Sequence, residues 1–227
     1  LLELVAREEA LDHHYALASL FEVMDVGARA DLKSDVLRDL EKQKQALMAY
    51  RGNPSIAQTV LDEVLQQIEQ CYNHLNNLAG KAGHQLTEND WLMSIRSRIG
   101  IPGGTCAFDL PAYHAWQQDP ADQRRADLQR WIATLTPLAD AISLLLTLLR
   151  DSGVPQKVLA PGGQFQQALP QGRTFQLLRL TLDPAQRLIP EISGNRLIVS
   201  IRLMRMGEDE RLHPSNEDAS LDLTLCS

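Results

Sequence analysis

Apolar residues at helical spacing dominate the first part of the chain. Between residues 32 and 50 they fall on one face of a helix, for which Asp31 suits the N-cap position. The sequence Arg-Gly-Asn-Pro at residues 51–54 ends this pattern. Gly favours the left-handed conformation found after a helix, and Asn53 and Pro54 favour the start of the next helix. We therefore expect a helical hairpin that turns at residues 51–54.

The second helix of this hairpin carries an apolar seam with alternating spacings of three and four residues, which is typical of coiled-coil-like packing. The seam consists of Leu61, Val64, Ile68, Cys71, Leu75 and Leu78. A short helix is then expected after a cap at residues 87–90, and a longer helical region after residues 119–120 that Pro137 kinks or divides. The apolar run from Ile142 to Leu149 is predicted to be the buried centre of that region. It is far shorter than the roughly 20 residues of a membrane span.

After residue 153 the pattern changes from helical spacing to alternation, which predicts β-strands. Ser193-Gly194-Asn195 suits a hairpin turn between two of them. The expected strands lie near residues 175–182, 188–192, 197–204 and 221–225. One more short strand is expected near residues 105–110, where partial alternation lies between Gly and Pro, and it would join the β domain. The patterns together predict an α+β protein, with a mainly helical domain at 1–152 and a β domain at 153–227.

The composition is that of a folded globular protein, because 44% of the 227 residues are apolar, 22% are charged, and there is no low-complexity tract. The net charge of −7 disfavours a general nucleic-acid binder, which needs a surplus of Lys and Arg to neutralise phosphates. Cys71, Cys106 and Cys226 are odd in number and widely spaced, so neither a disulfide framework nor a zinc site is indicated. We expect a protein of the reducing cytoplasm with no nucleic-acid partner and no membrane span.

We do not expect residues 1–7 to be a secretory signal, since they lack a charged leader, a long apolar stretch and a cleavage site. The first residue is Leu1 rather than Met. We therefore expect that N-terminal residues are missing from this sequence.

No motif for catalysis, metal binding or cofactor binding is present. His13 and His14 are adjacent and have no matching His or Cys pair nearby, so they are predicted to be surface histidines. The doublets at 103–104 and 162–163 lack the remainder of a phosphate-binding fingerprint and are predicted to be turns. There is no GxSxG motif and no Cys with a His partner at a recognisable spacing. We predict no enzymatic activity, no metal and no cofactor.

Arginine pairs are the remaining candidates for function. They occur at 96 and 98, at 124–125, and at 202 and 205. These residues could complement a helix dipole or blunt a sheet edge, or they could form a patch for an acidic peptide. His114 is expected at the edge of the core. The residues alone leave these alternatives open.

A series of short motifs resembles the ZapD family of division-ring-associated proteins. They are Ile101-Pro102-Gly103-Gly104, Phe108-Asp109-Leu110-Pro111, Trp131-Ile132-Ala133-Thr134-Leu135, Leu177-Leu178-Arg179-Leu180, Ile189-Pro190-Glu191-Ile192-Ser193-Gly194 and Ile201-Arg202. The resemblance runs in uninterrupted order from about Leu20 to the C-terminus. Such an ordered series is far more specific than any single motif.

The resemblance implies a helical domain joined to a β-sandwich-like domain, assembled as a homodimer and located in the cytoplasm at the division septum. It also implies a non-enzymatic protein that binds the C-terminal tail of the tubulin-like protein FtsZ, bundles its filaments and promotes Z-ring assembly. Basic surface residues carry this contact in the family. The matching positions here are Arg29, Arg96, Arg98, His114 and Arg202. Residues 1–9 do not match the basic segment with which family members begin.

Two other classes of function stay open. A regulatory small-molecule-binding protein would use a cleft between the two domains, because domain boundaries favour pockets, and it would need convergent polar groups there. An enzyme would need a cluster of titratable residues that only the fold brings together.

Overall fold

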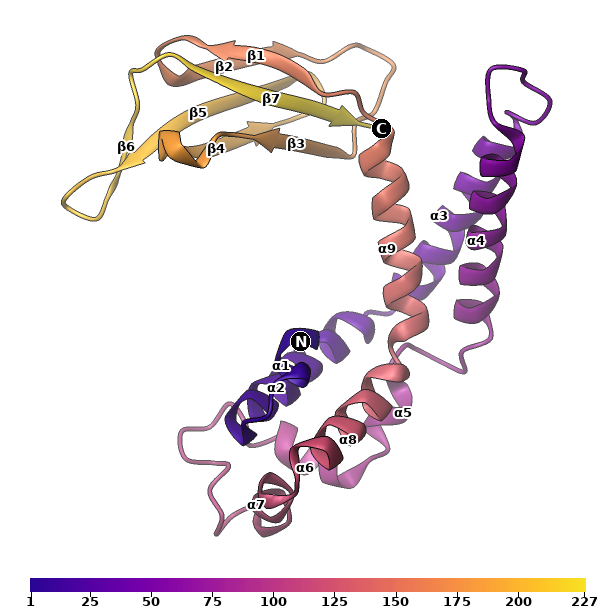
Figure 1. Cartoon of the computed structure of the whole chain (residues 1–227), viewed down its shortest axis with the longest axis vertical. Helices are drawn as coiled ribbons and strands as arrows, with labels where there is room; N and C mark the ends of the chain where they lie inside the picture. Colours follow the sequence, from indigo (N-terminus) through magenta and orange to yellow (C-terminus); the bar gives the residue numbers. More distant parts are fainter. The chain divides into compact units, whose positions relative to one another are not determined.

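The computed structural model describes residues 1–227 and contains nine α-helices followed by seven β-strands (Figure 1). The strands form two antiparallel sheets, so the predicted α+β class is confirmed. The chain divides into two compact units, a helical unit at Leu1–Leu145 and a C-terminal unit at Leu146–Ser227. Each unit is described by itself.

The first unit is made of helices. They are α1 (Leu2–Ala6), α2 (Ala10–Gly27), α3 (Leu32–Met48), α4 (Gln58–Asn76), α5 (His84–Thr87), α6 (Asp90–Arg96), α7 (Pro111–Gln118), α8 (Ala121–Ala133) and α9 (Thr136–Asp151), which runs past the end of the unit. Helix α2 contacts both α1 and α8. Its residues Leu17 and Leu20 are fully buried, as are Leu92 of α6 and Leu128 of α8. These side chains form the centre of the helical core.

The predicted helical hairpin is present as α3 and α4, which pack against each other. Gly52 has the expected left-handed conformation, with φ of 78°. Helix α4 nevertheless begins at Gln58 rather than at Pro54. Its first side chain accepts a hydrogen bond from the Gly52 amide at 3.2 Å and donates to the Asn53 carbonyl at 3.3 Å. Gln58 therefore closes a longer loop than the sequence pattern predicted.

The predicted cap at the start of α6 is confirmed, because the side-chain oxygen of Asn89 accepts a hydrogen bond from the Leu92 amide at 3.1 Å. The predicted division near Pro137 is also present, since α8 and α9 are separate helices bent by 66°. The expectation that Ile142 to Leu149 is a buried helix centre is wrong. These residues are partly exposed, Leu146 by 37%, and α9 buries only Leu138 and Ala141.

No single helix is long and apolar enough to cross a bilayer. Helices α8 and α9 reach that length and apolar composition only when they are taken together, as a pair bent by 66°.

The prediction of a strand near residues 105–110 is wrong. Residues 101–109 form consecutive turns, in which the Cys106 amide donates to the Gly103 carbonyl at 3.2 Å and the Leu110 amide to the Cys106 carbonyl at 3.0 Å. The backbone groups are satisfied locally and are not available for a sheet. The apolar Phe108 is 93% exposed, so the alternation did not reflect burial.

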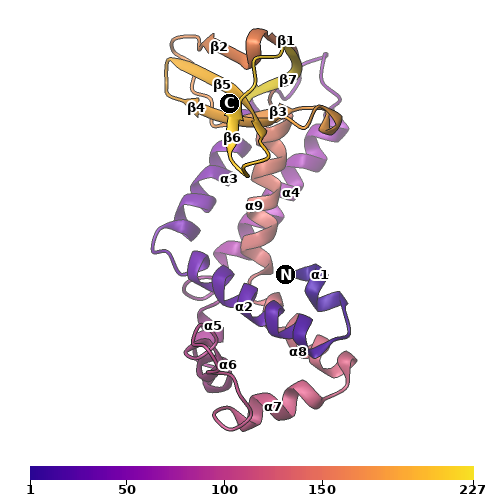
Figure 2. The same ribbon diagram turned by 90° about the vertical axis from the view of Figure 1, so that its left-hand side faces the viewer.

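The C-terminal unit is a sandwich of two antiparallel sheets that face each other (Figure 2). One sheet has the order β1-β7-β3 and the other β2-β5-β4, with β6 paired to β5. The strands are β1 (Gln156–Ala160), β2 (Gln164–Ala168), β3 (Leu177–Thr181), β4 (Ile189–Gly194), β5 (Ile198–Met206), β6 (Leu212–Pro214) and β7 (Ala219–Cys226). The core comes from both sheets and includes Val199, Ile201 and Leu203 of β5 with Leu221 and Leu223 of β7.

A tight turn at Pro161–Gly163 connects β1 to β2 across the two sheets. Gly163 is required there for two reasons. Its φ of 72° favours glycine, and a Cβ atom at this position would lie 2.2 Å from the Ser215 carbonyl oxygen. The predicted turn after β4 is present, because Asn195 accepts hydrogen bonds from the amides of Leu197 at 2.8 Å and Ile198 at 3.1 Å.

Candidate functional site

Arg96 joins the end of α6 to α2. Its guanidinium forms a hydrogen-bonded ion pair with Asp25, which lies in the last turn of α2. The Arg96 side chain is one-third exposed, and that of Asp25 is mostly exposed. Arg96 therefore holds two helices together and still presents part of its guanidinium to solvent.

Arg98 makes a similar contact with the turns that follow α6. Its guanidinium lies 3.6 Å from the Asp109 carboxylate, and both side chains are partly exposed. This pair spans the Ile-Pro-Gly-Gly segment, where Gly103 has a positive φ of 74°. The Ile-Pro-Gly-Gly motif thus lies in a loop whose end is joined to Arg98 by the ion pair with Asp109.

Arg29 and His114 have no ionic partner. Arg29 lies four residues beyond Asp25, just after α2, and is exposed. His114 was expected at the core edge but is exposed on α7. The reason is helical geometry, since α7 buries Tyr113 and Trp116 and turns the two residues between them outward.

Arg202 belongs to the C-terminal unit and lies on the outer face of the β2-β5-β4 sheet. Its cross-strand neighbours are Gln164 on β2 and Glu191 on β4. The guanidinium lies 3.7 Å from the Glu191 carboxylate, and both side chains are more than half exposed. A hollow of about 410 Å³, called here the Arg202 hollow, is lined by these residues together with Ser193 and Ser200.

The structure brings some of the predicted residues together and leaves others apart. Arg29 follows the C-terminal end of α2, and Arg96 contacts Asp25 in the last turn of the same helix. Arg98 is two residues from Arg96. His114 lies on a different helix. Arg202 lies in the other unit and is described alone.

The sequence missed a buried network that fixes the start of the chain. His13 was predicted to lie on the surface, but it is fully buried. Arg124 of α8, only 5% exposed, donates from Nε to His13 Nδ1 at 3.0 Å. Because Arg can only donate, the His13 proton is on Nε2, which lies 3.0 Å from the Arg7 carbonyl oxygen. No local pattern could reveal this pair, since its members are 111 residues apart.

Charge and burial keep His13 neutral. Burial lowers the pKa of His13 below its ordinary value, and the positive charges of Arg124 and Arg125 lower it further. The carbonyl groups of Val5 and Arg7 act in the opposite direction, because hydrogen bonds that they accept from the imidazole raise its pKa. Of the two arginines near the start of α8, Arg124 is buried and Arg125 is partly buried.

Arg124 and Arg125 are both occupied by backbone carbonyl groups. Arg124 also donates to the carbonyls of Glu8, Gln117 and Asp119, and Arg125 donates from Nε to the Val5 carbonyl at 3.1 Å. These contacts anchor α1 and the end of α7 to α8. Both arginines of this pair therefore contribute to the fold.

An aromatic cluster adjoins the network. The ring centroids of Trp91 and Trp131 are 5.3 Å apart and those of Trp91 and Trp116 are 5.6 Å apart. Tyr113 donates to or accepts from His14 Nδ1 at 2.7 Å, and burial raises the pKa of its hydroxyl. Nothing in this cluster resembles a catalytic arrangement, and no group of three or more His, Cys, Asp or Glu side chains is placed to hold a metal ion.

Comparison with known families is decisive for the identity. The family model described as ZapD, a cell division protein, matches residues 1–202. The chain belongs to the ZapD family. The match to ZapD takes in the whole helical unit and the C-terminal unit as far as Arg202. It begins at residue 1, which corrects the expectation that the likeness starts near Leu20. It ends at Arg202 rather than at the C-terminus.

Proposed function

We propose that this ZapD-family protein binds the C-terminal tail of FtsZ, cross-links FtsZ filaments as a homodimer and so promotes assembly of the division ring at the septum. The supporting observation is that three of the candidate arginines are held in place by single, partly exposed carboxylates. These pairs are Arg96 with Asp25, Arg98 with Asp109, and Arg202 with Glu191.

Such pairs suit an exchange of partners. An exposed ion pair contributes only about 0 to 1 kcal/mol, so a carboxylate of the tail can replace the internal one at small cost. The guanidinium is already oriented, and its planar set of donors matches a carboxylate. Arg29 is exposed and has no carboxylate to displace. We therefore assign Arg29, Arg96, Arg98, His114 and Arg202 to tail binding.

Two tail sites on one dimer explain bundling. Once one site holds a filament, the second meets neighbouring tails at an effective concentration far above that in bulk solution. Weak single contacts then give strong cross-linking. This function requires no catalysis, metal or cofactor.

The test is co-pelleting with FtsZ filaments, with intact FtsZ and with FtsZ that lacks its tail. We expect bundles only with the intact protein. The combined variant Arg96→Glu, Arg98→Glu and Arg202→Glu should lose bundling but keep its circular dichroism spectrum and mass.

A matched control reverses three other exposed arginines, Arg38, Arg51 and Arg211, which changes the net charge equally. We expect this control to bundle filaments like the native protein. Equal loss in both variants would mean that overall charge matters and that the assigned residues do not. Bundling of tail-less FtsZ would refute the tail as the partner.

A further inference from the structure

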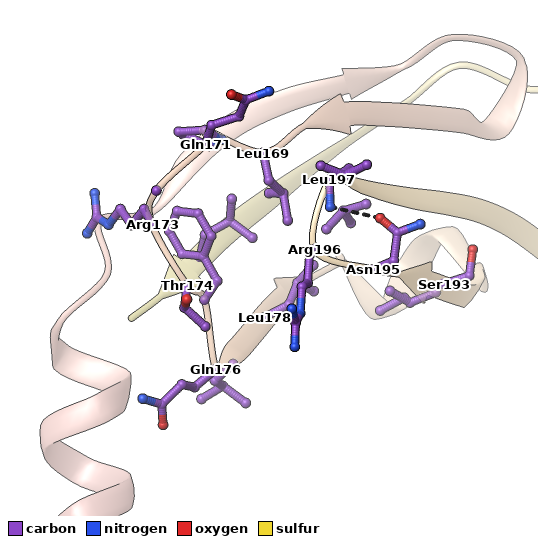
Figure 3. Close-up of a pocket in the computed structure, with 18 residues that line it drawn as sticks. Leu169, Gln171, Arg173, Thr174, Gln176, Leu178, Ser193, Asn195, Arg196 and Leu197 are labelled. Carbon is purple, nitrogen blue, oxygen red and sulfur yellow. Dashed lines mark hydrogen bonds between the residues drawn. The ribbon is translucent and has the colours of Figure 1, made fainter.

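The tryptophans of the chain gather around one hollow in the helical unit. A larger pocket of about 690 Å³ lies in the C-terminal unit, between the segment that connects β2 to β3 and the turn after β4, and Phe175 is its single aromatic residue (Figure 3). The smaller hollow has a volume of about 230 Å³ and is lined by Trp91, Trp116 and Trp131, which are all the tryptophans of the chain. It is called here the tryptophan hollow.

Three helices position the tryptophan rings. Trp91 lies in the first turn of α6, Trp116 on α7 and Trp131 on α8. The rings of Trp91 and Trp131 are stacked with an interplanar angle of 29°, and the ring of Trp116 meets that of Trp91 at 64°. Trp116 and Trp131 are buried, whereas Trp91 is partly exposed. Because the rings hold one another in place, the apolar walls of the hollow are formed before a partner binds.

Asp127 and Arg130 of α8 are the charged residues of the hollow. Both oxygens of the Asp127 carboxylate accept hydrogen bonds, one from Trp116 Nε1 at 3.1 Å and the other from the Arg130 guanidinium at 2.6 Å. The guanidinium also lies over the Trp131 ring, 5.7 Å from its centroid. The Arg130 side chain is 68% exposed, and a guanidinium has five N–H donors. Arg130 can therefore bind a further anionic group, whereas Asp127 already has its partners.

The size and charge of the hollow decide which kind of ligand it fits. Its volume is below the range of about 300 to 1,000 Å³ that is usual for small-molecule sites, so it suits one side chain of a larger partner. Aromatic rings can bind cations, but the Arg130 guanidinium already lies over the Trp131 ring and would repel a second cation. Trp and Arg are enriched among the residues that dominate protein–protein binding. The hollow therefore favours an apolar side chain with a carboxylate beside it.

The tryptophan hollow involves the same helices that carry candidate residues for tail binding. Arg96 is five residues beyond Trp91 on α6, and His114 is two residues before Trp116 on α7. Five residues of helix rise about 8 Å, and an extended peptide covers about 3.3 Å per residue. About three residues of a bound peptide thus span the rise from Trp91 to Arg96.

We propose that the tryptophan hollow receives an apolar side chain of the FtsZ tail, while a carboxylate of the same tail binds Arg130. This inference rests on the proposed function for the identity of the peptide. It adds an apolar anchor and a further arginine to a contact that was assigned to charge alone. It also requires that the bound part of the tail carries an apolar residue close to an acidic one.

The test measures binding of a synthetic peptide with the sequence of the FtsZ C-terminal tail to the whole chain, by calorimetry at low salt. Trp91→Leu keeps an apolar residue on α6 but removes the flat ring. We expect Kd to rise about tenfold, as for the loss of one apolar contact of this size. Arg130→Gln should raise Kd about fivefold, as for the loss of one exposed ion pair. Because Arg130 is exposed, this variant decides the question if Trp91→Leu does not fold.

Matched controls change similar residues of the same unit outside the hollow. Arg38→Gln removes an exposed arginine whose ion pair with Asp35 has the same three-residue spacing as that of Arg130 with Asp127. Tyr50→Leu removes an aromatic ring that is 47% exposed. Both controls should keep the native Kd. Circular dichroism and the urea midpoint of each variant verify that the fold is retained.

A second arm replaces each apolar residue of the peptide by Ala in turn. We expect one replacement to weaken binding to the native protein about tenfold and to cost much less in Trp91→Leu, which identifies the side chain in the hollow. Losses that simply add for every replacement would overturn the inference.

The remaining outcomes separate this inference from the proposed function. Native Kd in both Trp91→Leu and Arg130→Gln, combined with loss of binding in the Arg96, Arg98 and Arg202 variant, would overturn the inference and leave the proposed function intact. Absence of peptide binding to the native protein would overturn both. A change from dimer to monomer mass in Trp91→Leu, with native Kd for the peptide, would assign the hollow to the contact between two copies of the chain and also overturn the inference.

Discussion

Arg124 and His13 form a buried hydrogen bond of 3.0 Å that joins α8 to α2. Arg124 Nε is the donor and His13 Nδ1 the acceptor, so the contact exists only while His13 is neutral. Protonation of His13 would place two positive charges beside each other in the interior, with Arg125 as a third nearby. The stability of the helical unit is therefore linked to pH through this residue.

We predict that the free energy of unfolding falls as the pH drops below about 6.5. The unfolded chain protonates His13 near its ordinary pKa of 6.5, whereas the folded protein protonates it only at lower pH. The unfolded state binds more protons between these values, so acid favours unfolding. Urea denaturation at several pH values measures this, with His13→Gln giving a flatter dependence. Burial also lowers the pKa of His14, so His14 likewise makes the protein less stable as the pH falls. The variant His14→Gln measures how much of the pH dependence is due to His14. An unchanged slope in His13→Gln would refute the assignment.

We predict that Arg124→Ala destabilises the protein by about 3 to 5 kcal/mol, because it leaves the buried His13 and three partly buried carbonyl groups without a donor. The loss should appear as a lower urea midpoint by circular dichroism. Arg125→Ala is the matched control, since Arg125 is less buried and has fewer contacts, and it should cost about 1 kcal/mol. Similar losses in both variants would contradict a special role for Arg124.

Gly163→Ala should destabilise the C-terminal unit by about 3 kcal/mol, because the new Cβ atom meets the Ser215 carbonyl and the backbone has a positive φ. The neighbouring Gly162 has a φ of 55° and open space around it, so Gly162→Ala should cost only about 1 kcal/mol. Hydrogen exchange of the β5 amides reports on this unit. Equal protection in the two variants would show that the close contact relaxes freely.

We predict that light scattering gives the mass of a homodimer at micromolar concentration. We also predict that the filament bundles dissolve when the salt concentration is raised several-fold. The Debye length is about 8 Å at physiological ionic strength and shrinks further as salt is added, so exposed arginine contacts weaken. Bundles that survive while the dimer also survives would show that charge contributes little. A monomer mass would remove the bivalent mechanism.

The sequence predicted the features that depend on local chemistry. Gly52 has the predicted left-handed conformation, and α6 begins with a cap in the segment where one was expected, because turn and cap residues act on their immediate neighbours. Strands β1 and β2 were not predicted. The sequence of β1, Gln-Lys-Val-Leu-Ala, does not alternate, and β2 is rich in Gln, so pairing with β7 and β5 decides that they are strands.

Features that depend on contacts between residues far apart in the chain could not be predicted from the sequence. His13 was assigned to the surface because its partner Arg124 is far away along the chain. Residues 105–110 carried alternation but folded into turns. The candidate arginines could be named from the family motifs, whereas their carboxylate partners required the fold.

The aromatic cluster of the helical unit gives the two units different optical properties. Trp91, Trp116 and Trp131 are the only tryptophans, and all four tyrosines also lie before residue 146. The fluorescence and absorbance bands of tryptophan and tyrosine therefore come from the helical unit alone. Unfolding followed by fluorescence would report on that unit, while the C-terminal sandwich would unfold without an optical signal of its own in that range.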